Sequence, residues 1–127
     1  LLGELLITQR VMTKAWAPGA WEVSGGGVMA GETSAQAIQR EIWEETGLDV
    51  TGADGGYLFS YQRINPDEGD NYFVDIYRFE MDVKEEDVHI QTAEAMGFQF
   101  ADLDTIKKLA EQDQFLHYNS IKQAFEA

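Results

Sequence analysis

The chain has 127 residues, which fits one domain large enough to bury a hydrophobic core without disulfide or metal crosslinks. Its formal net charge is −14, so its surface should repel nucleic acid polymers and anionic membranes. It contains no cysteine, which excludes disulfides, thiolate catalysis and cysteine-ligated zinc and fits a reducing cytoplasm. No stretch approaches the roughly 20 apolar residues of a membrane-spanning helix.

The first quarter of the chain predicts two strands joined by a loop. Residues 4–10 are short and apolar and predict a strand, whereas residues 14–20 contain proline and glycine and predict a loop. Apolar residues alternate over 21–23, as expected for a second strand. The chain begins at Leu1, without an initiator methionine and close to a predicted strand, so we expect N-terminal residues to be missing. No linker or repeat interrupts residues 1–127, which predicts a single domain.

Residues 34–46 give the clearest helix signal in the sequence. Thr33 and Gln36 stand at the spacing of a capping box, and Gly47 stands where a helix C-cap glycine belongs. The segment between them contains neither proline nor glycine. The positions expected to face the core are Ala35, Ile38 and Ile42.

The rest of the chain alternates between predicted strands and helices. A strand is predicted at 57–64 after a glycine-rich turn at 52–56, and residues 65–70 form the next turn. Residues 72–81 look apolar on both faces, which predicts a central strand. The remaining elements are a strand at 97–101, a helix capped by Asp102 or Asp104 and running to about Glu111, and a helix at 118–126. This order predicts an α/β fold with helices on both faces of a mixed sheet.

Three carboxylates cluster on the predicted helix 34–46. At about 100° per residue, Glu41, Glu44 and Glu45 fall within a sector of about 100°. Like charges at this spacing repel one another, and a hard divalent cation such as Mg²⁺ would reverse that repulsion. Arg40 is four residues before Glu44 and could also reach Glu32, holding carboxylates in place through charge-assisted hydrogen bonds.

These residues belong to a longer pattern, G-x5-E-x7-R-E-U-x-E-E-x-G-U, in which U is aliphatic. Its positions are Gly26, Glu32, Arg40, Glu41, Ile42, Glu44, Glu45, Gly47 and Leu48. Average residue usage gives on the order of one chance match in a billion per starting position. The pattern is the complete signature of the Nudix hydrolase superfamily, and the chain resembles that superfamily over nearly its whole length.

The resemblance implies a Nudix fold, an α/β/α sandwich with a mixed β-sheet. It also implies metal-dependent hydrolysis of a diphosphate bond, usually in a nucleoside diphosphate linked to another group, with Mg²⁺ or Mn²⁺ as cofactor. Carried over position by position, the metal ligands would be Glu41, Glu44, Glu45 and the backbone carbonyl of Gly25.

The same resemblance assigns the remaining catalytic roles. Glu32 and Arg40 would form an orienting pair. The general base, which accepts a proton from the attacking water, would be Glu45 or a glutamate from a late loop. Glu94 matches that late glutamate, with Glu85 and Glu86 as nearby alternatives.

One departure concerns substrate choice. Ser24 stands where many nucleotide-hydrolysing members have proline, and residues 9–26 resemble a branch related to isopentenyl-diphosphate isomerase. Isomerisation of a prenyl diphosphate is disfavoured because that isomerase needs a cysteine and this chain has none. Another alternative is a non-catalytic Nudix domain that binds a phosphorylated ligand, against which the intact glutamates argue.

Candidate substrate contacts lie outside the pattern. Arg10, Lys14 and Arg63 could hold the phosphates of a small-molecule diphosphate, although surface ion pairs explain them equally well. The aromatic residues that could stack on a flat group are Trp16, Tyr57, Phe59, Tyr61 and Tyr72. His89 and His117 are interpreted as structural, since neither has ligand spacing. Because many superfamily members are homodimers, the resemblance also implies a homodimer.

Overall fold

The computed structural model of the protein describes residues 4–65 and 70–126. Its strands are β1 (Leu5–Arg10), β2 (Trp21–Glu22), β3 (Asp54–Asn65), β4 (Asp70–Glu80) and β5 (Ala95–Ala101). Its helices are α1 (Ser34–Thr46), α2 (Leu103–Glu111), α3 (Tyr118–Ile121) and α4 (Gln123–Glu126), with a 3-10 turn η1 (Glu85–Asp87). Within the described ranges, no helix is long and apolar enough to cross a membrane.

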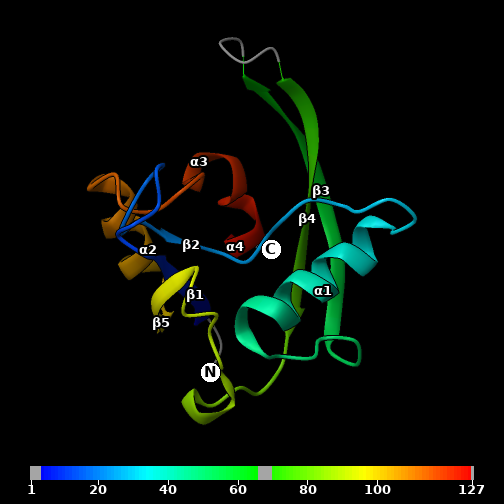
Figure 1. The fold of residues 1–127 in the computed structure, drawn as a ribbon, viewed down its shortest axis with the longest axis horizontal. Helices are drawn as coiled ribbons and strands as arrows, with labels where there is room; N and C mark the ends of the chain where they lie inside the picture. Colours follow the sequence, from blue (N-terminus) through cyan, green and yellow to red (C-terminus); the bar gives the residue numbers. More distant parts are fainter. Residues whose placement is uncertain (1–3, 66–69, 127) are drawn as a thin grey trace.

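The strands form two antiparallel groups. One has the order β2-β1-β5, and the other is the β3–β4 hairpin, whose ladder runs from Asp54 opposite Glu80 to Asn65 opposite Asp70. Among the described residues, parallel pairing is confined to one bridge between Trp21 and Phe115. Figure 1 shows the hairpin extending well beyond the other elements.

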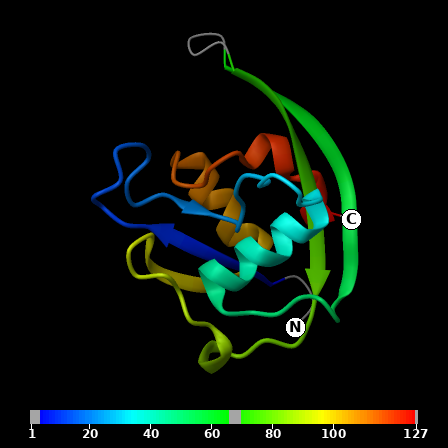
Figure 2. The ribbon, with the colours of Figure 1, turned by 45° about the vertical axis from the view of Figure 1, so that its right-hand side comes forward.

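Helices lie on both faces of the hairpin. Tyr77 on β4 faces α1, because its hydroxyl lies 2.6 Å from the Ser34 hydroxyl. The next residue, Arg78, donates to the Ala124 carbonyl on α4 at 3.2 Å. Successive residues of a strand point to opposite faces, so β4 lies between α1 and α4. The α/β/α arrangement expected from the sequence is therefore confirmed, and Figures 1 and 2 show it from two directions.

The core lies between β1, β5 and the C-terminal helices. Ile7 on β1 and Ile106 on α2 are completely buried. The other buried members of this cluster are Ala101, Phe115 and Ile121. Tyr61 and Ile76 pack against it from the hairpin, so the inner half of the hairpin is anchored to the core while the outer half is not.

The prediction of α1 is confirmed at both ends. Its N-cap Thr33 forms the capping box with Gln36, and Gly47 closes it in the left-handed conformation at φ 73°. Its most buried residues, however, are Ala37 and Thr46. The predicted core positions Ala35, Ile38 and Ile42 are only half-buried. The most buried positions of α1 therefore differ from those that the apolar spacing predicts.

The prediction that residues 72–81 form a central strand is wrong. β4 pairs only with β3 among the described strands, and Tyr72 and Phe73 remain 44% and 74% exposed. The strand before it starts earlier than predicted, so Gly55 lies in β3 instead of in a turn. A Cβ there would collide with the Arg78 carbonyl, which explains the glycine. The predicted turn at 65–70 mostly falls on residues 66–69, outside the described residues.

The prediction of one continuous C-terminal helix at 118–126 is also wrong. The segment forms two short helices, α3 and α4, separated at Lys122. α2 follows its prediction, with Asp102 as N-cap accepting from the Thr105 backbone at 2.8 Å.

Candidate active site

The loop before α1 brings its backbone unusually close to the helix. A Cβ placed on Gly26 would overlap the Glu41 carboxylate, whereas one on Gly27 would meet nothing within 4 Å. Glycine at position 26 therefore lets the loop lie against the carboxylate-bearing face of α1. The capping box at Thr33 fixes the start of the helix and so the direction of that face.

Arg40 is the centre of the site. Its guanidinium donates from Nε and Nη2 to both oxygens of Glu32, at 2.7 and 3.0 Å. Nη1 donates to Glu41 Oε1 at 2.8 Å and to Glu44 Oε2 at 3.2 Å. Nη2 also donates to the Gly27 carbonyl at 3.0 Å. One arginine thus ties the loop to three glutamates, including the predicted Glu32 pair.

The Glu32 carboxylate is held firmly ionised by these contacts. The Arg40 hydrogen bonds lower its pKa most, and the Met29 backbone N–H adds to the effect from 2.9 Å. The Arg40 pKa is raised in return, through its bonds to Glu32 and Glu41. A bidentate arginine–carboxylate pair fixes orientation as well as charge, which makes Glu32 a support for Arg40.

Glu45 forms no ion pair with this network among the described residues. Burial, together with the nearby charges of Glu41 and Glu22, raises its pKa to about 7. A hydrogen bond with the Ser24 side chain and one with the Gly25 backbone partly oppose that rise. The Glu45 carboxyl group is therefore half-buried and hydrogen-bonded, but no cationic side chain of the described residues pairs with it.

Glu22 joins the site, although the sequence interpretation passed over it. It lies on β2 and accepts from Arg10 Nη1 at 3.3 Å. Burial raises its pKa against the lowering effect of Arg10, and the charge of Glu94 raises it too. The signal that could have found it is its position two residues before Ser24, since alternate residues of an extended chain share a face.

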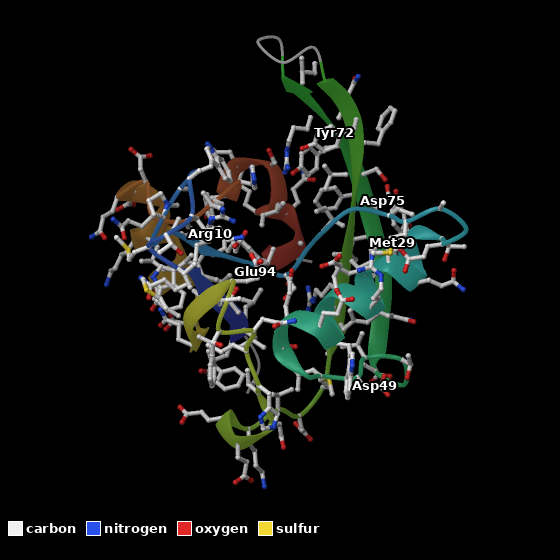
Figure 3. All side chains as sticks on the ribbon, in the orientation of Figure 1. Arg10, Met29, Asp49, Tyr72, Asp75 and Glu94 are labelled. Atoms are coloured by element: carbon white, nitrogen blue, oxygen red, sulfur yellow. The ribbon has the colours of Figure 1, made fainter. Side chains whose placement is uncertain are left out.

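Glu94 comes to the site from the loop before β5. Its side chain is 58% exposed and forms an ion pair with Lys14, whose hydrogen bond is the main cause lowering the Glu94 pKa. The backbone carbonyl of Glu94 also accepts from the Val11 N–H at 3.2 Å. The alternatives Glu85 and Glu86 lie exposed on η1. Figure 3 shows Glu94 near Arg10, in the central part of the molecule.

The three predicted phosphate-binding residues already have partners. Arg10 donates to the Trp16 carbonyl from Nε at 3.2 Å and from Nη2 at 2.9 Å, besides binding Glu22. Lys14 is paired with Glu94. Arg63 instead contacts two tyrosine hydroxyls on the hairpin, so the structure does not bring it into the cluster on α1.

The predicted metal ligands do not form a ready-made cage. In the described part of the chain, no three His, Cys, Asp or Glu side chains converge closely enough to hold an ion. Arg40 engages one oxygen each of Glu41 and Glu44. The donor chemistry nevertheless fits a hard divalent cation, because carboxylates and the Gly25 carbonyl are oxygen ligands. A cation would also reverse the repulsion that raises the Glu45 pKa.

Comparison with known proteins gives one family. The family model of the NUDIX domain matches residues 2–123. An uncharacterised Nudix hydrolase of Listeria innocua is 31% identical over 125 residues, which cover 98% of this chain and 70% of the relative. The CTP pyrophosphohydrolase of Escherichia coli is 41% identical over 61 residues, covering 48% of this chain and 43% of that enzyme.

Solved structures support the fold. A MutT protein from Methanosarcina mazei aligns over 98% of this chain and 83% of its own, with a TM-score of 0.72 and 21% identity. A Caenorhabditis elegans Ap4A hydrolase aligns over 85% and 74% with a TM-score of 0.65 and 21% identity. The fold and the family together define an enzyme that hydrolyses phosphoric anhydride bonds. The chain belongs to the Nudix hydrolase family.

Proposed function

We propose that the protein hydrolyses a diphosphate linkage in a nucleoside diphosphate joined to another group, with Mg²⁺ or Mn²⁺ as cofactor. The observation that carries this proposal is a contrast between the glutamates that Arg40 binds and Glu45, which it does not bind. Arg40 holds Glu32, Glu41 and Glu44, while Glu45 beside them is half-buried and forms no ion pair within the described part of the chain. Such an uncompensated carboxylate suits the binding of a cation.

The chain's own residues would divide the work as follows. Glu41, Glu44, Glu45 and the Gly25 carbonyl would hold the metal, which supplies charge neutralisation and polarisation of the phosphorus–oxygen bond. Glu32 would act through Arg40, keeping its guanidinium in a fixed plane between the glutamates. Gly26 would keep the loop close to Glu41, so that the carbonyl of Gly25 stays near the ligand side chains.

The proton of the attacking water needs a carboxylate acceptor that is not already paired with a cationic side chain. The Lys14 ion pair engages Glu94 and lowers its pKa, whereas Glu45 forms no ion pair among the described residues. We therefore favour Glu45 over Glu94.

The relatives suggest where the substrate search should begin. They include a CTP pyrophosphohydrolase and a putative 8-oxo-dGTP diphosphatase from Mycobacterium tuberculosis. Nucleoside triphosphates therefore come first in a panel that also holds nucleoside diphosphate sugars, dinucleotides and prenyl diphosphates. The cytoplasmic location, the single domain and the homodimer stay predictions.

The test measures release of phosphate, pyrophosphate or nucleoside monophosphate from this panel, with Mg²⁺, with Mn²⁺ and with chelator. We expect metal-dependent cleavage that Glu45→Gln reduces roughly a thousandfold, because the variant loses both a ligand and a base. The matched control is Glu85→Gln, which removes an exposed carboxylate on η1 and should keep wild-type turnover.

Each other outcome has a defined meaning. Full activity of Glu45→Gln would remove that residue from the chemistry. Cleavage that persists in chelator would overturn the metal assignment. A prenyl product with a moved double bond and an intact diphosphate would replace hydrolysis by isomerisation.

A further inference from the structure

Hydrogen bonds fix both ends of α1 to the rest of the protein. Of its 13 residues only Ala37 and Thr46 are buried, so hydrogen bonds matter more for its position than they do in a deeply buried helix. At the C-terminal end, the His89 N–H donates to the Thr46 carbonyl at 2.8 Å. At the N-terminal end, the Tyr77 hydroxyl on β4 lies 2.6 Å from the hydroxyl of Ser34, the first residue of the helix.

The Tyr77 ring is itself held on two sides. Tyr57 lies directly opposite on β3 and meets it edge to face, with ring centroids 5.7 Å apart and planes at 73°. Phe79 stacks on it from two residues further along β4, with centroids 6.1 Å apart and planes at 11°. Aromatic neighbours in these geometries restrict the ring, so its hydroxyl defines one position for Ser34.

Asp75 reinforces this contact from the same face of the hairpin. It lies two residues before Tyr77 on β4, so both side chains point toward α1. Asp75 accepts from the Ser60 hydroxyl at 2.6 Å, and hydrogen bonds from Ser60 and Ser34 hold its pKa below the ordinary value. The first turn of α1 contains no acidic residue, so Asp75 supplies the negative charge that a helix N-terminus favours. Figure 3 shows Asp75 on the hairpin beside the start of α1.

The start of α1 also carries the support of the glutamate network. Glu32 lies two residues before Ser34 and holds Arg40 through hydrogen bonds of 2.7 and 3.0 Å. The turn at Glu32 is closed, because its carboxylate accepts from the Met29 N–H at 2.9 Å and its own N–H donates to the Met29 carbonyl at 3.0 Å. A displacement of Ser34 would therefore move Glu32 relative to Arg40, which lies further along the helix.

We propose that Tyr77 is a positioning residue of the hydrolase site, which acts through Ser34 to keep Glu32 in place to bind Arg40. Tyr77 lies on the hairpin, outside the motif at residues 26–48 that contains the other members of the site. The expected effect on turnover rests on the proposed function. The expected effect on the Glu32–Arg40 pair depends on neither metal nor catalysis.

The first test therefore uses the metal-free protein. Nuclear magnetic resonance measures solvent exchange of the Arg40 Nε–H and the Met29 amide, because both donate to Glu32. Tyr77→Phe removes the hydroxyl and keeps the ring. We expect it to raise both exchange rates roughly fivefold to tenfold, as loss of one hydrogen bond makes local opening easier. The Arg40 signal is identified by its absence in Arg40→Lys.

Matched variants separate this contact from general effects. Tyr57→Phe removes the hydroxyl that lies 2.6 Å from the Ser60 hydroxyl within the hairpin, and should change the exchange rates less than about twofold. Ser34→Ala should reproduce Tyr77→Phe, whereas Ser34→Thr keeps a hydroxyl and should stay close to wild type. The double variant of Tyr77→Phe and Ser34→Ala should be no worse than either single variant, because both remove the same bond.

The second test measures turnover and Mn²⁺ binding. With the substrate that the wild type cleaves best, Tyr77→Phe should lower kcat roughly fivefold to tenfold and weaken Mn²⁺ binding, with KM nearly unchanged. Tyr57→Phe should lose about as much stability to chemical unfolding, since each variant loses one hydroxyl contact, but should keep kcat. A purely structural role of Tyr77 would not separate the two variants in this way.

The outcomes distinguish this inference from the proposed function. Exchange rates and kcat that are the same in Tyr77→Phe and Tyr57→Phe would overturn the positioning role and leave metal-dependent cleavage intact. So would a Ser34→Ala variant that behaves like the wild type. Faster exchange in Tyr77→Phe and Ser34→Ala, in a protein whose wild type cleaves no substrate, would keep the link from Tyr77 to Arg40 and overturn the proposed function alone.

Discussion

Arg40 on α1 and Arg63 on β3 carry the same side chain in opposite surroundings. Arg40 forms ion pairs with three glutamates, which neutralise its charge within the protein. Its role is to hold these glutamates in place. Arg63 is held by two tyrosines and keeps its charge without a carboxylate among the described residues. The difference suggests that Arg40 supports the carboxylates of the candidate site, whereas Arg63 organises aromatic side chains of the hairpin outside that cluster.

Among the tests of this comparison, the largest effect is expected from a substitution of Arg40. Arg40→Gln would leave three neighbouring carboxylates without a counter-ion, and loss of such supporting contacts typically costs 10- to 100-fold. We expect kcat/KM to fall about 100-fold for every substrate that is cleaved. Arg63→Gln changes an arginine outside this cluster and should lower kcat/KM far less.

The measurement is kcat/KM across nucleotide and prenyl substrates at saturating Mg²⁺. Arg40→Lys provides a graded control, because it keeps the charge and loses the two-pronged contact with Glu32. A loss in Arg40→Gln confined to one class of substrate would mean that Arg40 recognises a substrate group and does not support the carboxylates.

The two arginines also differ in how well the sequence predicts them. Helix α1, its caps and the Arg40–Glu32 pair follow from spacings of three to eight residues within one motif. Local signals of this kind depend on backbone geometry, which is the same in any protein.

The surroundings of Arg63 depend on contacts between distant segments. Whether β4 was central or at an edge depended on tertiary packing that no local period records. The candidate metal site lies between these cases, since its carboxylates and the Arg40 contacts with Glu32 and Glu44 could be predicted from the motif, whereas the contact between Arg40 and Glu41 could not.

Substitutions of two neighbouring glycines before α1 should change kcat/KM less than substitution of Arg40, and they test the support of Glu41. A Cβ at position 26 would overlap the Glu41 carboxylate, so Gly26→Ala should push Glu41 off its contact with Arg40. We expect roughly a tenfold loss of kcat/KM and weaker Mn²⁺ binding, in line with disturbed ligand support. Gly27→Ala meets open space and should stay close to wild type. Equal losses in both variants would point to loop stiffness instead of contact with Glu41.

The smallest effect concerns the stability contribution of Glu45, a half-buried group that, like Arg63, forms no ion pair among the described residues. Its ordinary pKa of 4.5 rises to about 7 in the folded chain. Between these pH values the folded chain holds a proton that the unfolded chain has released. The resulting stability is present below pH 4.5 and is lost as the pH rises through about 7.

Glu45→Gln removes this titration, so wild type and variant should diverge as the pH rises. Solvent reaches part of the carboxyl group, so we expect the variant to be only about 1 kcal/mol more stable at pH 8, and equal at pH 4. Chemical unfolding in chelator measures the difference, and added Mg²⁺ should narrow it by binding the wild type alone. A difference independent of pH would mean that packing, not charge, separates the two proteins. A difference that grows with pH would show that the residue proposed to catalyse also destabilises the fold, as expected for a carboxylate kept uncompensated for a cation.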